Sequence, residues 1–585
     1  MDMPTQLVLP RLWIIGMLFF STVGVTVAIN PFTAFDPINL IKMLFLTSAS
    51  FGLIPYLLSS IRTLQKFGTI FLTAGIIMIS GMFLAALASP TSITQQVWGV
   101  WGRSTGILTY FSLLVLMYTT AVFVIQVGNA NYLLDWFQKT SYFITFYVLI
   151  QYADLDPINW SQKLPFATLG NINFMSSFLG LATCLLISRT AFIKMRFTTK
   201  TFFLLISLLN SVLIIETESI QGLGIIMVGV IVIGFIRTWN KLGKVIAGSY
   251  VVSLSFFGGF IFFGFAGIGP LGKWLVQDTV LYRLDYWGAG LRMFLDNPIF
   301  GVGADSYGDY YREYRDLIAV ERTGPGRISN TAHNVFLDIL SGSGAVAGLS
   351  FITIFLGISF LTLRLALRSK EKIEVKLLSP LILSSSVFLL VSINQIGVAV
   401  WIFLFLGVAL GVLVLNNQTP LIGIANSKRI PKSSQLSSIG LSRNLSKNSL
   451  PIFLASIFLA CVGFFLSLQP NATDTRFLSA FREDNVGKML KITDQIGATR
   501  FHDEKILEIL VNRENDKSTL EVARKIFEKY PRSFYAAQAI YFNPYTSTED
   551  RLKMAKILKY LEPNDRLVLE GWLDSSDSFI QAPKL

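Results

Sequence analysis

Long apolar segments recur along this chain and constrain its fold more than any other feature. A helix of about 20 residues crosses the hydrocarbon core of a bilayer. Only 15% of the residues are charged and 52% are hydrophobic, whereas about a quarter of a soluble domain is charged. The sequence therefore predicts an all-α, polytopic helical membrane protein with about twelve core transmembrane helices plus one more. The thirteen predicted spans are residues 12–29, 39–61, 69–88, 105–127, 141–153, 173–188, 202–216, 222–237, 244–266, 344–364, 378–394, 397–416 and 449–468.

Basic residues in the connecting loops predict the orientation of these spans. Lys and Arg concentrate in cytoplasmic loops of membrane proteins. With a cytoplasmic N-terminus, twenty-one of them fall in loops on that side and two, Arg103 and Lys163, in the short loops opposite. We therefore expect a multi-pass plasma-membrane protein whose loop 267–343 and C-terminal tail are extracytoplasmic. The same asymmetry explains the net charge of +13 through topology and contact with anionic membrane lipids, so no nucleic-acid partner is expected.

The chain divides into four predicted parts. They are a membrane core (1–416) with the outer loop, a cytoplasmic basic linker (417–448), an additional span (449–468) and an extracytoplasmic soluble tail (469–585). In the tail, ARKIFEKYP (523–531) and AKILKYLEP (555–563) each place Ala eight residues before Pro, 32 residues apart. This spacing resembles tetratricopeptide repeats and predicts a helical-repeat-like tail. An ordinary helical tail with coincidental Ala and Pro is the alternative.

Arginine dominates the basic residues of the outer loop. From Lys273 to Arg327 the loop has six arginines and one lysine. Guanidinium groups bind phosphate and carboxylate bidentately, whereas lysine acts as a point charge. Two interpretations stay open, namely ion pairs that fold the loop and a site for pyrophosphate or anionic lipid. The arginines are Arg283, Arg292, Arg312, Arg315, Arg322 and Arg327.

Two helices are predicted within this loop. The segment YRLDYWGAGLRMFLDNP (282–298) has the pattern of an amphipathic helix that Pro298 ends. Its Trp and Tyr beside Arg are typical of a helix that lies along the membrane surface. The next segment, IFGVGADSYGDYYREYR (299–315), predicts a glycine turn followed by a second polar helix. One face of the first helix holds Arg283, Trp287, Gly290 and Phe294.

The chain has two histidines, and one stands at the end of the outer loop. His333 lies in TAHNVFLDILSGSGAVAG (331–348), directly before an apolar run with spaced glycines that allow close helix packing. A neutral imidazole accepts a proton from a hydroxyl near physiological pH, and either Asn334 or Asp338 would orient it. The residues alone leave a structural and a catalytic histidine equally open. His502 has no cluster of partners in the sequence, so no catalytic role is expected for it.

Five motifs together resemble one known family. RLDYWGAG, NPIFGVGADSY and TAHNVFLDILSGSGAVAG follow one another in the outer loop, and WGRSTG (101–106) and LGNINFMSSFLGL (169–181) lie upstream. The ordered set, over about residues 95–415, resembles the O-antigen ligase and O-antigen polymerase superfamily of bacterial membrane glycosyltransferases.

The resemblance implies a reaction on the outer face of the bacterial plasma (inner) membrane. As ligase or polymerase in surface polysaccharide assembly, such an enzyme transfers a glycan from an undecaprenyl diphosphate carrier. The acceptor is a hydroxyl on lipid A core, another lipid-linked glycan or a protein. The resemblance implies neither a metal nor a cofactor.

The resemblance also implies roles for individual residues. His333 would be the base that activates the acceptor, while Arg283 and a second arginine would hold the pyrophosphate. Many relatives carry a Ser-Arg-Gly motif for the second arginine, but this chain has TESIQGLG (217–224), so Arg103 is the predicted substitute. The predicted substrate-binding residues are Arg283, Arg103, Arg292, Trp287 and Asn334.

Three other functions stay open from the sequence. They are O-linked protein glycosylation by the same chemistry, a lipid or polysaccharide transporter without bond-making chemistry, and a scaffold whose tail recruits an envelope-assembly protein. Ion-coupled carriers usually bury ionisable groups midway through their spans. Glu216, Glu218 and Asp338 lie near predicted span ends instead, which favours the transferase.

Overall fold

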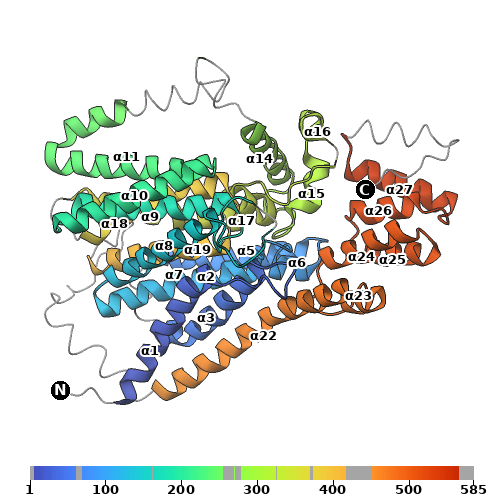
Figure 1. Ribbon diagram of the computed structural model, residues 1–585, viewed down its shortest axis with the longest axis horizontal. Coiled ribbons are helices and arrows are strands. Elements are labelled where there is room, and N and C mark those ends of the chain that lie inside the picture. The colour runs from blue at the N-terminus through green and yellow to red at the C-terminus, as the bar shows by residue number, and fades with distance from the viewer. Residues whose placement is uncertain are drawn as a thin grey trace.

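The protein is a helical bundle with a helical cap at one end (Figure 1). The structure is a computed structural model, and it describes residues 5–60, 63, 69–160, 163–253, 269, 278–324, 326–368, 373–416 and 449–564. Within these residues every regular element is a helix, which confirms the all-α prediction. The helices of the bundle are α1 (Thr5–Phe19), η1 (Phe20–Gly24), α2 (Val25–Val27), α3 (Asn39–Ser59), α5 (Thr69–Ala88), α7 (Ile107–Val127), α8 (Asn131–Tyr152), α9 (Ile172–Phe192), α10 (Phe197–Glu216), α11 (Ile220–Leu242), α17 (Val335–Ala366), α18 (Ile373–Val391), α19 (Ile396–Leu415) and α22 (Ser449–Arg482).

Ten of the described helices are long and apolar enough to cross a membrane. They coincide with ten of the thirteen predicted spans. The first predicted span corresponds to α1, η1 and α2, and the span predicted at 141–153 falls within the longer, less apolar α8. The span predicted at 244–266 lies largely outside the described residues.

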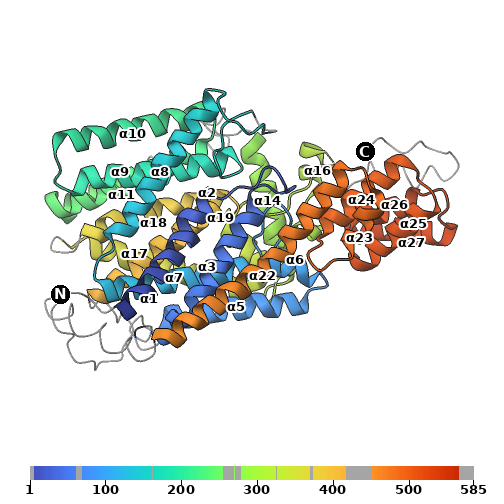
Figure 2. The ribbon, with the colours of Figure 1, turned by 60° about the horizontal axis from the view of Figure 1, so that its bottom comes forward.

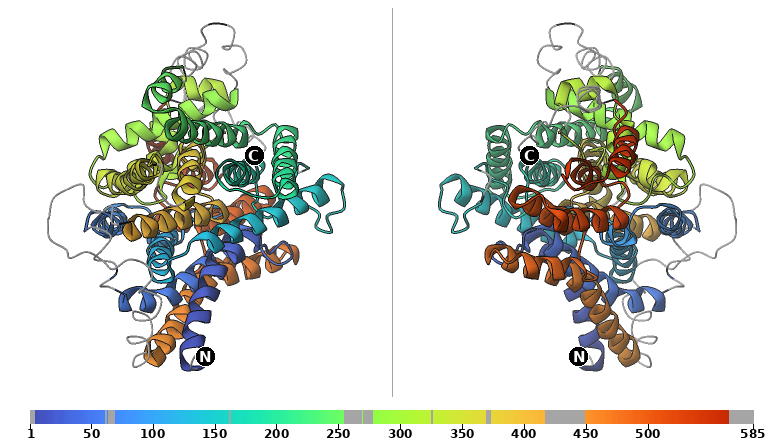
Figure 3. Two further views of the ribbon diagram at one scale, coloured as in Figure 1. Left: turned by 90° about the vertical axis from the view of Figure 1, so that its left-hand side faces the viewer. Right: turned by 90° about the vertical axis from the view of Figure 1, so that its right-hand side faces the viewer.

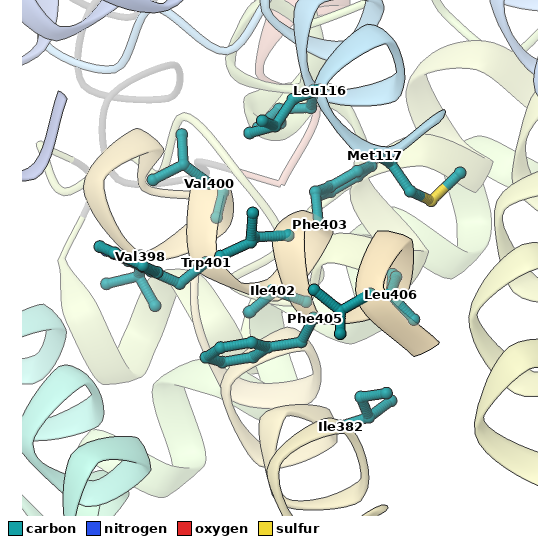
Figure 4. Packing of buried hydrophobic residues seen from close by; sticks show 14 of the residues in the cluster. Leu116, Met117, Ile382, Val398, Val400, Trp401, Ile402, Phe403, Phe405 and Leu406 are labelled. Atoms are coloured by element: carbon teal, nitrogen blue, oxygen red, sulfur yellow. The ribbon is translucent and has the colours of Figure 1, made fainter. Parts of the chain in front are cut away.

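Helices α7 and α19 form the centre of the bundle. Their apolar windows are 94% buried in each case, because apolar side chains cover all sides of both helices and neighbours enclose them. Figure 4 shows Trp401, Phe403 and Phe405 of α19 in one apolar cluster with Leu116 and Met117 of α7. Helices α3, α17 and α18 are among the neighbours of this apolar pair.

A buried lysine joins the first span to α3. Lys42 Nζ donates to the carbonyl oxygens of Val25 (2.8 Å), Thr26 (2.7 Å) and Ala28 (3.0 Å). The last carbonyls of a helix have no partner within it, so the ammonium group satisfies the end of α2. This arrangement accounts for a charge in an apolar helix.

We expect Lys42→Ala to destabilise the fold by about 1–3 kcal/mol, because buried carbonyls lose their donor. The measurement is the unfolding midpoint of the purified protein in detergent. Lys42→Arg keeps a cationic donor and is expected to lose less. Equal midpoints for wild type and Lys42→Ala would contradict the role of this lysine.

The segments predicted to be extracytoplasmic meet at one end of the bundle. There lie α6 (Ile93–Trp98), α14 (Asp278–Asp296), α15 (Tyr307–Tyr314) and α16 (Leu317–Thr323), at the end opposite the N-terminus (Figure 1). Both helices predicted in the outer loop are confirmed, as α14 and α15. Helix α17 begins at Val335, nine residues before the predicted span at 344.

Helix α22 connects the membrane bundle to the tail. It runs alongside α3 and continues to Arg482, about 14 residues or 21 Å beyond the predicted span end. In Figure 2 it crosses the length of the bundle and leads into the tail, and Figure 3 shows both ends of the molecule. The tail helices are α23 (Val486–Thr493), α24 (Arg500–Arg513), α25 (Lys517–Lys529), α26 (Phe534–Phe542) and α27 (Thr548–Leu561). The assignment of the tail to tetratricopeptide repeats stays a prediction.

Candidate active site

His333 lies in a strained turn directly before the N-terminus of α17. Its φ of 51° is left-handed, a conformation that few non-glycine residues adopt. The Thr331 hydroxyl accepts the His333 backbone N–H at 3.0 Å, and the imidazole stacks on the Tyr286 ring with centroids 5.3 Å apart. Strain of this kind persists only where neighbours enforce it, so this turn fixes the position of the imidazole.

The two residues expected to orient His333 hold the turn itself. Asn334 is the N-cap of α17, since its side chain accepts the Leu337 N–H at 3.1 Å. Asp338 Oδ1 accepts the Ala332 N–H at 2.6 Å. Asp338 thus binds the backbone directly before His333, and Asn334 caps the helix that begins two residues after it.

Two arginines from distant parts of the sequence act on the imidazole. Burial lowers the pKa of His333 most, and the positive charges of Arg103 and Arg283 lower it further, to about 3. Arg103 belongs to the loop between α6 and α7, whereas Arg283 is on α14. The imidazole of the unliganded site is therefore neutral at physiological pH and lies beside two cationic groups.

Arg103 is placed by a loop of unusual backbone geometry. Gly102 and Ser104 on either side of it both have left-handed φ angles, 79° and 55°. The Asp305 carboxylate accepts from the Val100 N–H at 2.6 Å and from the Thr105 hydroxyl at 3.2 Å. Asp305 thereby closes this loop onto the outer loop.

The guanidinium of Arg103 can donate a further hydrogen bond to a ligand. Burial lowers the pKa of Arg103, and the nearby carboxylates of Asp305 and Asp338 oppose that shift. Its Nη1 is buried and has no hydrogen-bond partner among the described residues. A buried guanidinium nitrogen without a partner is costly, and an anionic ligand would satisfy it.

Arg283, on α14 of the outer loop, also lies near His333. Its Nε donates to the Val391 carbonyl at the end of α18, at 3.2 Å. One helical turn later, the buried Nε1 of Trp287 has no partner within the described part of the chain. The face of α14 predicted to bear Arg283 and Trp287 thus has one polar group bound to the protein and one without a partner in the described residues.

A small polar cavity of about 30 Å³ adjoins the histidine turn. Asn394 contributes an amide whose two polar atoms are buried and unpaired within the described residues. The volume holds about one water molecule, so the cavity is too small for a diphosphate. Its polar lining includes Thr105, Tyr110, Asp305, Tyr307, Thr331, Asp338 and Asn394.

The remaining arginines of the loop contact groups of the loop and of the tail. Arg312 and Arg315 pair with Glu562 of the tail at 2.9 and 2.6 Å, and Arg322 pairs with Asp285. Arg327 lies 5.0 Å over the ring of Tyr282. For these four arginines the structure shows ion pairs and a ring contact within the protein, as the first of the two interpretations predicted.

Arg292 lies apart from the imidazole, nine residues along α14 from Arg283. Its Nε donates to the Tyr314 carbonyl at 2.8 Å and its Nη2 is 3.4 Å from Asp316. It lines a second cavity of about 420 Å³ between the outer loop and the end of the tail. Nine residues of helix span about 13 Å, so the predicted binding residues form two groups.

The glycines after His333 admit the backbone of the outer loop. A Cβ at Gly344 would lie 2.0 Å from the Ile299 carbonyl oxygen, and φ at this glycine is 70°. Val302 and Gly303 donate their N–H groups to the Ser341 and Gly342 carbonyls at 2.9 and 2.8 Å. The break in α17 therefore docks the GVG turn, where the sequence indicated close approach of another helix.

The motif without the expected arginine packs against another predicted motif. Ser219 donates to Asn173 Oδ1 at 2.9 Å and lies 2.6 Å from Ser176 Oγ. Gln221 is buried, and both of its amide atoms lack partners among the described side chains and backbone. TESIQGLG and LGNINFMSSFLGL thus form one polar contact between α9 and α11.

Sequence reasoning missed two contributors to the histidine site. Tyr286, which stacks on the imidazole, lies three residues after Arg283 in RLDYWGAG. Its place in that motif was the only feature of the sequence that pointed to the site. Asp305, which anchors the Arg103 loop, lies in the GADSY motif. Among the described residues no group of three or more His, Cys, Asp or Glu side chains is placed to hold a metal ion.

Comparison with known families identifies the central part of the chain. Residues 202–352 match the family model described as O-antigen ligase. The match runs from α10 into α17, contains His333 and Arg283, and leaves Arg103 outside. No curated protein matches the chain.

Proposed function

The chain belongs to the O-antigen ligase and polymerase superfamily, and we propose that it transfers a glycan from an undecaprenyl diphosphate carrier to an acceptor hydroxyl at His333. Glycan transfer of this type in surface polysaccharide assembly follows from the family. One observation supports the site most, namely the approach of Arg103 and Arg283 to a neutral imidazole. The site combines a base with two phosphate-binding groups.

The proposed reaction is a displacement at the anomeric carbon of the carrier-linked sugar. A His333 ring nitrogen takes the acceptor proton, and the acceptor oxygen forms a bond to the anomeric carbon. The bond from that carbon to the diphosphate oxygen breaks, and its electron pair leaves with undecaprenyl diphosphate. Arg103 and Arg283 stabilise the charge that develops on the leaving group, and the proton on His333 passes to solvent.

Donor binding also adjusts the base. The two guanidinium charges contribute to the low pKa of His333, and a bound diphosphate would offset them. The pKa of His333 then rises, while the larger lowering by burial remains. A stronger base is thereby formed only when the donor is present.

This coupling predicts two different pH profiles. The dependence of kcat/KM reports the free enzyme and that of kcat the substrate complex. Because the pKa of free His333 is about 3, protonation does not remove the base above pH 5, and kcat/KM is expected to be flat from pH 5 to 8. In contrast, kcat is expected to begin to fall at a higher pH than kcat/KM does, because the pKa of His333 is higher in the donor complex. A kcat/KM that falls with an apparent pKa near 6.5 would contradict this account.

Arg292 has a separate proposed role in binding the glycan. Its cavity contains carboxylates, guanidinium groups, an amide and the Tyr314 ring, which together donate to and accept from sugar hydroxyls. We expect Arg292→Ala to raise KM for the lipid-linked donor several-fold with little change in kcat, as is typical of lost uniform binding. An unchanged KM would remove Arg292 from the binding site.

A further inference from the structure

We infer that the C-terminal tail is a positioning element of the transfer site, with Phe501 and Asp474 acting through Trp101 on the loop that presents Arg103. The inference rests on the proposed function, because it concerns the arginine assigned there to the diphosphate. It assigns the tail a role within this chain, whereas the sequence left recruitment of a partner by the tail as one open alternative.

The tail meets the Arg103 loop at Trp101, two residues before the arginine. The Trp101 and Phe501 rings stack with centroids 3.6 Å apart and planes 4° apart. The indole Nε1 of Trp101 donates to Asp474 Oδ1 at 2.8 Å. Phe501 is on α24, and Asp474 is on the part of α22 beyond the predicted span. Stacking and hydrogen bonding together fix both the plane and the rotation of the indole.

Asp474 is held in turn by the first connection of the membrane core. It is fully buried, and its Oδ2 accepts the N–H groups of Phe35 and Asp36 at 2.7 and 3.1 Å. His502 Nε2 lies 3.3 Å from Asp474 Oδ1. A buried carboxylate needs such partners, so Asp474 joins core, tail and Arg103 loop at one point.

The Arg103 loop needs support because its conformation is strained. Ser104, directly after the arginine, has a left-handed φ of 55°, and such an angle in a non-glycine residue persists only when surroundings enforce it. Asn39 of α3 donates to the Gly102 carbonyl at 2.7 Å. Since Asp305 binds Val100 from the other side, Trp101 is the position at which the tail completes the constraint.

A second route connects the tail to the same loop through the outer loop. Arg500, next to Phe501 in sequence, forms an ion pair with Asp309 of α15. Asp309 accepts from Gln95 Nε2 at 2.8 Å, and the same amide donates to the Asp305 carbonyl at 3.2 Å. The tail therefore reaches Asp305, which binds the Arg103 loop directly.

Further contacts keep the tail docked on the outer loop. The Arg315 and Glu562 side chains are both fully buried in their ion pair. The Arg532 guanidinium lies 3.6 Å over the Tyr310 ring and pairs with Glu313. In Figures 1 and 2 the tail helices lie against the same end of the bundle as α6. Buried charge pairs are costly to break, so the tail is an integral part of this end.

A double-mutant cycle tests whether Phe501 acts through Arg103. The assay is glycan transfer from an undecaprenyl-diphosphate-linked oligosaccharide by the full chain in proteoliposomes. We expect Phe501→Ala to lower kcat/KM for the donor about 10- to 100-fold and Phe501→Trp to retain most of it. In an Arg103→Ala background, Phe501→Ala is expected to cost less than 3-fold more, because residues that act through one another are not additive. Fully multiplicative losses would overturn the inference.

Hydrogen exchange tests the positioning without any substrate. Residues 99–106 are expected to exchange at least 10-fold faster in Phe501→Ala than in wild type, since their constraint is lost. Tyr545→Ala removes an exposed tail ring far along the chain from the loop and is the matched control, expected to leave this exchange unchanged. Trp101→Phe keeps a stacked ring without the Asp474 bond and serves if Phe501→Ala unfolds. Unchanged exchange in folded Phe501→Ala would overturn the inference, whereas a wild type without transfer activity would refute the proposed function alone.

Discussion

His333→Ala is expected to lower the rate of glycan transfer about 10²- to 10⁴-fold while the protein remains folded, because a general base contributes about that much. The His333 backbone N–H donates to the Thr331 hydroxyl, and the imidazole stacks on Tyr286. These two contacts fix the position of the imidazole. The measurement is steady-state transfer in proteoliposomes, beside the unfolding midpoint.

His333→Gln separates chemistry from structure in this prediction. Glutamine keeps polar atoms near the ring position but cannot take a proton from a hydroxyl. We expect it to be as inactive as alanine, with an unfolding midpoint closer to wild type. Recovery of transfer in His333→Gln would assign His333 a structural role.

Removal of either phosphate-binding arginine is expected to have the second largest effect. Loss of one preorganised donor to a developing anion costs about 10²- to 10³-fold in kcat, and we expect this loss for both Arg103→Ala and Arg283→Ala. Arg103→Lys keeps the charge without the bidentate fork and is expected to fall in between.

The control for this pair is another cation predicted on the same face. Lys163 is exposed in the connection between α8 and α9, so Lys163→Ala lowers the net charge of that face without a change at the site. Transfer by this variant is expected to match wild type. Wild-type kcat and donor affinity in Arg103→Ala would exclude it as the second pyrophosphate ligand.

The helical fold was predictable because its main signal is local. An apolar run of about 20 residues specifies a span whatever the rest of the chain does, and ten described helices match predicted spans. The predicted span began nine residues too late, because the serines and glycines at 341–344 interrupt the apolar run that starts at Val335. The Asn334 cap explains why the helix begins at Val335. The left-handed φ of Gly344 explains why it changes direction at that glycine.

The site was only partly predictable because its contacts join distant parts of the chain. Arg103 and Arg283 are 180 residues apart in sequence, and only the folded chain brings both near His333. The ion pairs of Arg312 and Arg315 are with Glu562, about 250 residues away. The arginine-rich sequence therefore left ion pairs and an anion site both open, and the structure shows that most of these arginines bind protein groups.

The central claim is that this chain forms a glycosidic bond at the expense of a diphosphate linkage, and one measurement tests it most directly. Wild-type protein in proteoliposomes receives a donor labelled in both glycan and undecaprenyl diphosphate, with lipid A core, lipid-linked glycan and a hydroxyl-bearing protein as acceptors. The account predicts one undecaprenyl diphosphate released for each glycan transferred, with none from His333→Ala above background. Movement of intact donor across the bilayer without release of undecaprenyl diphosphate would contradict it and indicate a transporter.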